Sequence, residues 1–176
     1  YLHQHKILHR DLKPGNILMD NFLCPKICDF GLSKIEHSNL STQTINSTLT
    51  VKGTPAYIAP EIWKKQKYSK SSDVYSFGVL VYELITNEIP FKGKDIFEIK
   101  SEVEKGKRPK IPNWVPEHYS DLIKRCWSQD PNDRPSFKCI VDHLIDDQDF
   151  VKDLIDKDDF LDFVEYTDKC VTDFES

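Results

Sequence analysis

The stretch "SSDVYSFGVLVYELITN", residues 71–87, constrains the fold of this chain more than any other part of its sequence. It predicts a helix that begins near Ser71 or Ser72, because serine favours the N-cap position. Its apolar side chains then fall on nearly every side, and such a helix is stable in water only where other elements surround it. A mainly helical body built around this segment is therefore expected.

Three amphipathic helices are expected to provide that cover. They are predicted in "KDIFEIKSEVEKG", "YSDLIKRCWSQ" and "SFKCIVDHLI", residues 94–106, 119–129 and 136–145, where apolar residues recur at helical spacing. The residues at this spacing are Ile96, Ile99, Lys100 and Val103, then Leu122, Ile123, Cys126 and Trp127, and finally Phe137, Ile140, Val141 and Leu144. The run "DPNDRP", which ends at Pro135, separates the last two helices.

The N-terminal part predicts a small amount of β-structure. The runs "NILMD" and "PKICDF" at residues 16–20 and 25–30 are short and β-like, and together they predict a hairpin. Residues 1–8 are expected to be the last turns of a helix, and residues 31–52, rich in Ser and Thr without a sustained period, are expected to be a mobile loop. The expected fold class is thus mainly α, of α+β type.

Composition narrows the kind of protein. A chain of 176 residues is long enough for one domain with a real core. The longest apolar run, "FGVLVY" at residues 77–82, is far too short to span a bilayer, so no membrane partner and an intracellular, cytoplasmic location are expected. The five cysteines are scattered, which favours buried reduced thiols over a disulfide framework or a zinc site.

Charge is distributed unevenly along the chain. Residues 146–176 carry 12 acidic and 3 basic side chains, whereas residues 1–145 carry 17 acidic and 21 basic ones. The expected organisation is one domain over residues 1–145 and an acidic tail over residues 146–176, folded as two short helices or partly disordered. The basic excess of the domain is too small to predict a nucleic-acid partner.

A set of short motifs identifies the family that this chain resembles. "HRDLKPGN" at residues 9–16 is followed by "DFG" at 29–31, "GTPAYIAPE" at 53–61 and "SDVYSFGV" at 72–79. In order and spacing these motifs, with "CWSQDPNDRPSF" near residue 130, resemble the eukaryotic protein kinases. The resemblance covers about residues 1–145 and implies the larger, mostly helical lobe of a kinase, with the hairpin beside its catalytic loop.

The resemblance also implies how phosphoryl transfer from ATP would be divided among residues. Asp11 is implied to be the base that orients and deprotonates the substrate hydroxyl, and Lys13 to neutralise the transferring phosphate. Asn16 and Asp29 are implied to ligate Mg²⁺, as oxygen donors suited to a hard cation. Leu18 is implied to form the floor beneath adenine. The implied cofactors are ATP and Mg²⁺.

Other matched positions are implied to be structural. His9 and Phe30 resemble the stacked pair that couples the catalytic loop to the magnesium loop, and Asp73 resembles the buried acid that holds the catalytic-loop backbone. Glu61 and Arg134 resemble a buried ion pair, whose rupture usually costs about 3 to 5 kcal/mol.

The resemblance further indicates substrates and regulation. Lys13 and Thr54 are similar to their counterparts in kinases that phosphorylate protein Ser or Thr, and the C-terminal motifs look most like the tyrosine-kinase-like branch. Arg10 and Lys34 are implied to receive an activating phosphate on Thr50, with Thr48 and Ser47 as weaker alternatives. Thr54 is expected to hydrogen-bond Asp11 and Lys13.

Two functions remain open from sequence. The family's Gly-rich phosphate loop, its strand lysine and the partner glutamate of that lysine do not occur in this sequence. The first hypothesis is a fragment of an active serine/threonine kinase that lacks its smaller N-terminal lobe and is nearly inactive alone. The alternative is a non-catalytic kinase lobe that serves as a binding or regulatory module.

Overall fold

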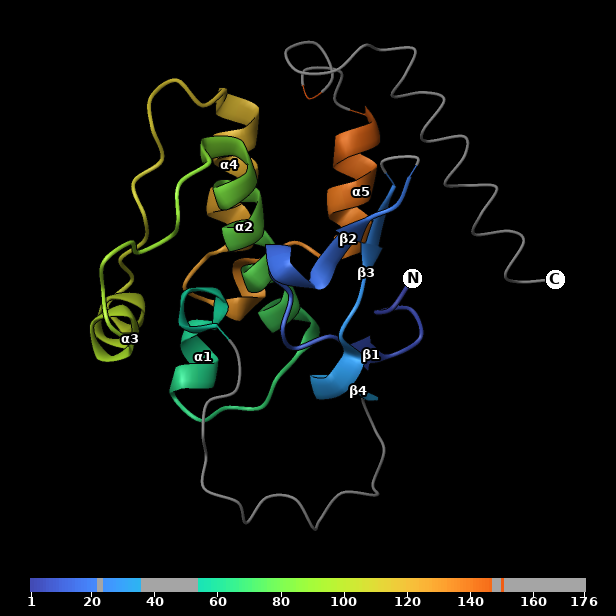
Figure 1. Cartoon of the computed structure of the whole chain (residues 1–176), viewed down its shortest axis with the longest axis horizontal. Coiled ribbons are helices and arrows are strands. Elements are labelled where there is room, and N and C mark those ends of the chain that lie inside the picture. Colours follow the sequence, from blue (N-terminus) through green and yellow to red (C-terminus); the bar gives the residue numbers. More distant parts are fainter. Residues whose placement is uncertain (22–23, 36–53, 147–149, 151–176) are drawn as a thin grey trace, which may run out of the picture. The chain divides into compact units, whose positions relative to one another are not determined.

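The computed structural model describes residues 1–21, 24–35, 54–146 and 150, and Figure 1 shows how the elements follow one another. The strands are β1 Ile7–Leu8, β2 Ile17–Met19, β3 Pro25–Ile27 and β4 Lys34–Ile35. The α-helices are α1 Pro60–Trp63, α2 Lys70–Thr86, α3 Ile96–Glu104, α4 Glu117–Cys126 and α5 Phe137–Asp146. Short 3-10 helices are η1 Pro14–Asn16, η2 Phe30–Leu32, η3 Pro55–Tyr57 and η4 Pro131–Asp133. The chain divides into two units, residues 1–137 and residues 138–176.

Helix α2 lies at the centre of the first unit. Its side chains Val74, Tyr75 and Val79 are at most 1% exposed, and the helix packs against α4 and η3. Its N-cap is Ser69, two residues before the expected start, and the hydroxyl of Ser72 accepts the backbone N–H of Ser69 from the third helical position. The predicted buried helix and the mainly α fold class are confirmed.

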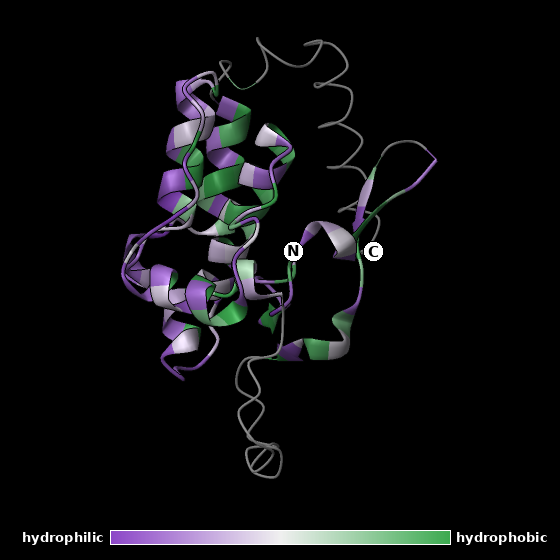
Figure 2. Cartoon of the chain, turned by 60° about the vertical axis from the view of Figure 1, so that its left-hand side comes forward, coloured by the Kyte–Doolittle hydropathy of each residue, from purple (hydrophilic) through white to green (hydrophobic). Residues whose placement is uncertain are grey.

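Helices α3 and α4 of the first unit bury their apolar sides, whereas α5 lies almost entirely in the second unit. In Figure 2 the hydrophobic colour of the first unit gathers where its helices face one another, and the hydrophilic colour lies on their outer sides. Helix α3 buries Ile99 and Val103, whereas Ile96 is 43% exposed. Helix α4 buries Leu122, Ile123 and Cys126, followed by the buried Trp127. In α5 the expected apolar position 140 is buried, whereas Val141 is 50% exposed.

The predicted hairpin is confirmed, and a second pair of strands joins it. β2 pairs antiparallel with β3, with Ile17 opposite Ile27. β4 pairs antiparallel with β1, with Leu8 opposite Lys34. The loop predicted for residues 31–52 is therefore wrong for residues 31–35, which form η2 and β4 because the backbone of β1 provides hydrogen-bonding partners that a sequence pattern does not reveal.

Residues 2–6 form a turn rather than an α-helix, but this turn closes with the hydrogen bonds that are typical of a helix C-terminus. The backbone N–H of Ile7 donates to the carbonyl of Leu2 at 2.9 Å, and that of Lys6 donates to the carbonyl of His3 at 3.3 Å. Lys6 has a φ of 59°, the left-handed conformation that closes a helix in this pattern of bonds. The expected structure of the acidic tail lies outside the described residues, apart from Asp146 and Phe150.

None of the helices in the described ranges is both long and apolar enough to cross a membrane.

Candidate active site

The loop of residues 9–16 is held from beneath by one buried carboxylate. Asp73, in the first turn of α2, is 2% exposed. Its Oδ2 accepts the backbone N–H of His9 at 2.9 Å, and its Oδ1 accepts that of Arg10 at 2.8 Å. Arg10 has a φ of 72°, a conformation that few residues other than glycine adopt. Two hydrogen bonds to a charged acceptor stabilise this otherwise strained backbone.

Asp11, Lys13 and Asn16 converge within this loop. Lys13 Nζ lies 2.8 Å from Asp11 Oδ2, and Asn16 Nδ2 lies 3.2 Å from the same oxygen. Asn16 Nδ2 also donates to the backbone carbonyl of Asp11 at 2.8 Å. Asp11 is 9% exposed and Asn16 is 5% exposed, so these bonds form where little water competes. The loop thus presents one carboxylate whose position is set by a cation and an amide.

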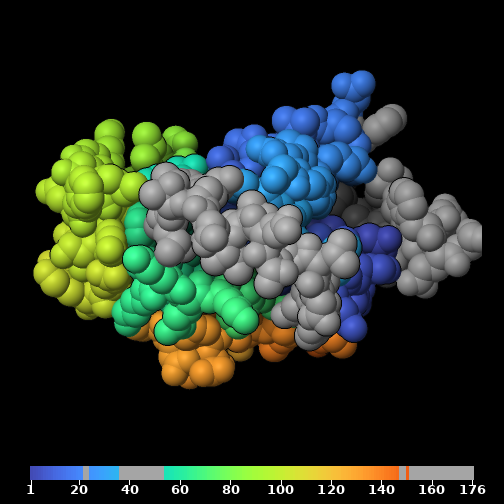
Figure 3. Space-filling model, turned by 90° about the horizontal axis from the view of Figure 1, so that it is seen from below, coloured from blue at the N-terminus to red at the C-terminus, as the bar shows by residue number. Residues whose placement is uncertain are grey.

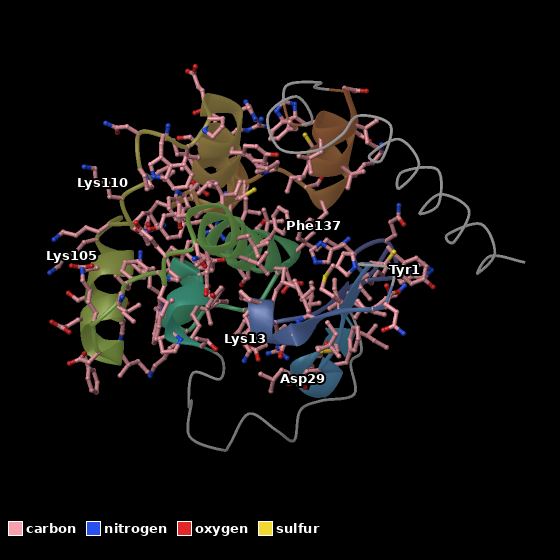
Figure 4. All side chains as sticks on the ribbon, turned by 45° about the horizontal axis from the view of Figure 1, so that its top comes forward. Tyr1, Lys13, Asp29, Lys105, Lys110 and Phe137 are labelled. Carbon is pink, nitrogen blue, oxygen red and sulfur yellow. The ribbon has the colours of Figure 1, made fainter. Side chains whose placement is uncertain are left out.

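Asp29 reaches the same region from the hairpin. It follows Cys28, whose backbone N–H donates to the carbonyl of Asn16 at 2.9 Å. Asp29 has a φ of 59°, and its Oδ1 accepts the backbone N–H of Gly31 at 3.2 Å. A Cβ at Gly31 would lie 3.0 Å from that oxygen, so a side chain there would crowd it. Figure 4 shows Lys13 and Asp29 near each other, on the two segments that the bond between Cys28 and Asn16 joins.

An aromatic contact links these two segments. The rings of His9 and Phe30 lie 5.3 Å apart in an edge-on arrangement, and His9 Nε2 lies 3.0 Å from the carbonyl of Cys28. Phe30 is 48% exposed, and Leu18 on β2 is 59% exposed. Leu18 therefore presents an exposed apolar side chain on the hairpin, available for contact with an apolar group of a ligand.

Glu61 and Arg134 form a buried bidentate ion pair that joins α1 to the segment after η4. Both oxygen–nitrogen distances are 2.8 Å, and the Arg134 side chain is fully buried. Arg134 also donates to the carbonyls of Ser71 and Ser128, each at 2.9 Å, and to that of Gln129 at 3.5 Å, so its remaining donors are used. Burial alone would raise the pKa of Glu61, but the hydrogen bonds and charge of Arg134 outweigh it and lower that pKa below its ordinary value.

The residues expected to receive a phosphate are only partly described. The Arg10 guanidinium lies 4.4 Å from the centre of the Tyr68 ring, and its Nε is buried without a hydrogen-bond partner among the described residues. Lys34 is exposed on β4. Thr54 lines a small cavity with Arg10 and Asp11, but its expected hydrogen bonds to Asp11 and Lys13 are not formed within the described part of the chain. Positions 47, 48 and 50 lie outside the described residues.

Three contacts at the site were not predicted from sequence. His3 Nε2 lies 2.8 Å from Asp73 Oδ2, so a third group bonds the buried carboxylate. Tyr68 packs its ring against the guanidinium next to Asp11. The hydroxyl of Tyr57 donates to Glu83. Tyr57 lies within the "GTPAYIAPE" motif, but His3 and Tyr68 lie outside the matched motifs, and the sequence gives no signal for their contacts.

The oxygen donors present fit Mg²⁺ bound together with a phosphorylated ligand. The side chain of Asp29 is exposed, and Asn16 directs its amide nitrogen to Asp11, which leaves its Oδ1 for a cation. No group of three or more His, Cys, Asp or Glu side chains suited to a metal occurs among the described residues. Protein oxygens alone would therefore not enclose the ion, and phosphate oxygens and water would complete its coordination, as Mg²⁺ prefers.

Comparison with known proteins agrees with this geometry. Residues 1–144 match the family model described as protein tyrosine and serine/threonine kinase. The dual specificity protein kinase shkC of Dictyostelium discoideum is 42% identical over 147 residues, which cover 80% of this chain and 28% of that protein. From the same organism, "Probable serine/threonine-protein kinase drkD" is 37% identical over 143 residues, 80% of this chain and 11% of its own length.

A viral relative has the same character. A protein of Acanthamoeba polyphaga mimivirus, named "Putative serine/threonine-protein kinase/receptor R818", is 38% identical over 148 residues, 83% of this chain and 8% of its own length. The chain therefore spans between 8% and 28% of the length of these relatives.

The fold and the site thus define a protein-kinase catalytic lobe. The chain belongs to the protein tyrosine and serine/threonine kinase family.

Proposed function

We propose that the protein to which this chain belongs is a serine/threonine kinase that transfers the γ-phosphate of ATP to hydroxyl groups of protein substrates, with Asp11 as the base. The observation that carries this proposal is the position of the Asp11 carboxylate, bonded by Lys13 at 2.8 Å and by Asn16 at 3.2 Å in a loop anchored to buried Asp73. Positioning supplies much of the rate of phosphoryl transfer, and these contacts fix the base before substrate arrives.

Each residue of the loop has a distinct role in the proposal. Asp11 orients the substrate hydroxyl and accepts its proton at a carboxylate oxygen. Lys13, whose side chain is 26% exposed, turns its ammonium group from Asp11 toward the transferring phosphate oxygens. Asn16 and Asp29 hold Mg²⁺, which neutralises charge on the phosphates when bound. Leu18 supports the apolar face of the nucleotide base.

Two observations support Ser and Thr as acceptors. Relatives that share 37% and 38% identity with this chain are named as serine/threonine-protein kinases. The chain also carries Lys13 two residues after Asp11 and Thr54 in the "GTPAY" motif. Another relative is named as dual specificity, so tyrosine is the competing acceptor that an experiment must test. The cytoplasmic location expected from the sequence stays a prediction.

The test uses the full-length protein, purified with and without the substitution Asp11→Asn. Incubation with labelled ATP and protein substrate is expected to give phosphoserine or phosphothreonine, and Asp11→Asn is expected to remove nearly all of it. The matched control is Asp121→Asn, because Asp121 is exposed on α4 and pairs with Lys124 at the surface.

Predominant phosphotyrosine, or full activity of Asp11→Asn, would contradict the proposal. A folded full-length protein that transfers no phosphate would favour the alternative of a non-catalytic binding or regulatory module.

A further inference from the structure

The connection between α1 and α2 carries a concentrated positive charge. The sequence "KKQKYSK" places Lys64, Lys65, Lys67 and Lys70 within seven residues, and all four side chains are exposed. Residues 64–70 are called the lysine segment below. The one acidic residue between positions 54 and 70 is Glu61, and its charge is already neutralised by Arg134.

Three lysines of this segment form no ion pair with a carboxylate of the described residues, whereas six of the twelve lysines described elsewhere do. Elsewhere, lysines pair with carboxylates at Asp11, Asp20, Glu102, Asp121 and Asp142. Within the described residues, Lys64, Lys65 and Lys67 make no such pair. Like charges this close together repel one another, so an external acidic group would lower the electrostatic energy of the segment.

The backbone of the segment is fixed rather than free. The N–H of Gln66 donates to the carbonyl of Glu61 at 3.0 Å, and the N–H of Lys65 donates to the carbonyl of Ile62 at 3.0 Å. Lys65 has a φ of 62° at this helix end, where glycine is the residue usually found. The side chains of Lys64 and Lys65 therefore project from a backbone that hydrogen bonds hold in place.

The segment also lies next to the base of the proposed reaction. Tyr68, inside the segment, packs its ring 4.4 Å from the guanidinium of Arg10, which directly precedes Asp11. Tyr68, Arg10, Asp11 and Thr54 line one small cavity. In Figure 3 residues 54–70 and residues 24–35 share one face of the molecule. Tyr68, which follows Lys67 directly, therefore places this part of the chain beside the cavity that Asp11 lines.

We propose that the lysine segment, Lys64, Lys65 and Lys67 above all, binds acidic side chains flanking the phosphorylated Ser or Thr, so that the substrates are acidic peptide segments. This inference rests on the proposed kinase function. Lysine suits it because its long flexible stem carries a point charge that can follow carboxylates at several positions.

The test measures binding separately from catalysis. Binding of two fluorescent peptides to the full-length protein is compared. One peptide carries Glu residues around the acceptor Ser, and the other carries Gln at the same positions. Their Kd values are measured by fluorescence anisotropy and their kcat/KM values by phosphate transfer. Because exposed ion pairs are individually weak, the acidic peptide is expected to bind roughly ten-fold more tightly. That preference is expected to shrink as salt is raised.

Two variants of the segment test its role. The triple variant Lys64→Gln, Lys65→Gln and Lys67→Gln is expected to lose most of the preference for the acidic peptide. Changing the same residues to Glu is expected to reverse it. The control replaces the exposed lysines Lys92, Lys105 and Lys110 by Gln and is expected to keep the preference. Thermal unfolding of each variant verifies that it is folded.

The outcomes separate this inference from the proposed function. Equal Kd values for the two peptides would overturn the inference whether or not phosphate is transferred. A preference for the acidic peptide that survives when Lys64, Lys65 and Lys67 are changed to Gln and when they are changed to Glu would overturn it too. Transfer to the neutral peptide without any acid preference would leave the kinase function standing alone. Binding of phosphatidylserine vesicles that depends on the three lysines, without binding of the acidic peptide, would assign the segment to a membrane surface instead.

Discussion

The carboxylate of Asp73 holds the backbone N–H of Arg10 at 2.8 Å although 63 residues separate them in the chain. The same carboxylate accepts the N–H of His9 at 2.9 Å and lies 2.8 Å from His3 Nε2. Central helix α2 therefore sets the backbone position of the two residues that directly precede Asp11. The position of the loop that carries Asp11 therefore depends on the folded position of helix α2.

The substitution Asp73→Asn tests this link. The amide keeps one acceptor oxygen but points an NH₂ group at a backbone N–H, so one buried donor is left unsatisfied. The expected loss of unfolding free energy is about 1 to 3 kcal/mol, and kcat is expected to fall more than KM rises, because the loop that carries the base is displaced. Urea unfolding and steady-state kinetics of the full-length protein measure both.

Asp121→Asn serves as the comparison, since Asp121 is 59% exposed and belongs to a surface pair. Unchanged kinetics in folded Asp73→Asn would show that the loop keeps its geometry without this anchor.

The Glu61–Arg134 pair predicts a large asymmetry between single and double variants. Arg134→Met leaves the Glu61 carboxylate buried without its partner, and the expected cost is about 3 to 5 kcal/mol of unfolding free energy. Adding Glu61→Gln removes that charge and is expected to restore part of the loss. Lys138→Met is the control, because Lys138 is 77% exposed in its pair with Asp142 and is expected to cost about 0 to 1 kcal/mol. Equal losses in Arg134→Met and Lys138→Met would contradict the assignment.

Acid titration provides an independent prediction for the same pair. The pKa of Glu61 is lower in the folded protein than its ordinary value, despite burial, because of Arg134. The stabilisation is therefore present above the unfolded pKa of about 4.3 and is lost as pH falls through the lower folded value. Stability measured from pH 7 downward is expected to fall below about pH 4, and less steeply in the Glu61→Gln, Arg134→Met double variant. Identical pH profiles would rule out this contribution.

The sequence predicts the parts of this molecule that depend on local pattern or on motif. Helix α2 could be predicted because apolar residues on every side require burial, and Asp11 and Asn16 could be assigned by resemblance. β4 could not be predicted, because its two residues form a strand only by pairing with β1. The contact of Tyr68 with Arg10 joins positions 58 residues apart, and nothing in either local sequence specifies that pairing. Such contacts arise from the packing of whole elements rather than from propensity.

Packing of α2 on α4 leads to a prediction at Gly78. A Cβ at this position would lie 2.7 Å from the Cβ of Cys126 and 3.1 Å from the backbone nitrogen of Trp127. Neither atom is the end of a flexible side chain, so Gly78→Ala forces the helices apart. Alanine would gain about 1 kcal/mol in helix propensity, but overpacking is expected to outweigh it and to give a net loss of about 1 to 2 kcal/mol.

Urea unfolding measures the loss, with Gly15→Ala as the control, because the nearest atom to a Cβ at Gly15 is 4.0 Å away. Cys126→Gly removes the closest contact. Gly78→Ala is therefore expected to cost less unfolding free energy in the Cys126→Gly background than in the wild type. A Gly78→Ala protein as stable as the wild type would show that α2 and α4 can separate at no cost.

Regulation by phosphate gives the last prediction, and it begins at Arg10. Its Nε is buried without a hydrogen-bond partner among the described residues, although its backbone and NH1 are bonded. A buried donor left unpaired is costly, and a phosphate group of charge about −1.5 to −2 would satisfy it with charge-assisted hydrogen bonds. Thr50, three residues before Gly53, is the proposed site of that phosphate, with Thr48 and Ser47 as weaker candidates. We expect Thr50→Ala to lower kcat of the full-length kinase at least ten-fold and to make its activity insensitive to phosphatase.

Thr42→Ala, in the same Ser- and Thr-rich stretch, is the control and is expected to retain both activity and phosphatase sensitivity. Arg10→Gln is expected to abolish the difference between phosphorylated and dephosphorylated protein, and a phosphatase response that persists in Arg10→Gln would show that the phosphate acts elsewhere.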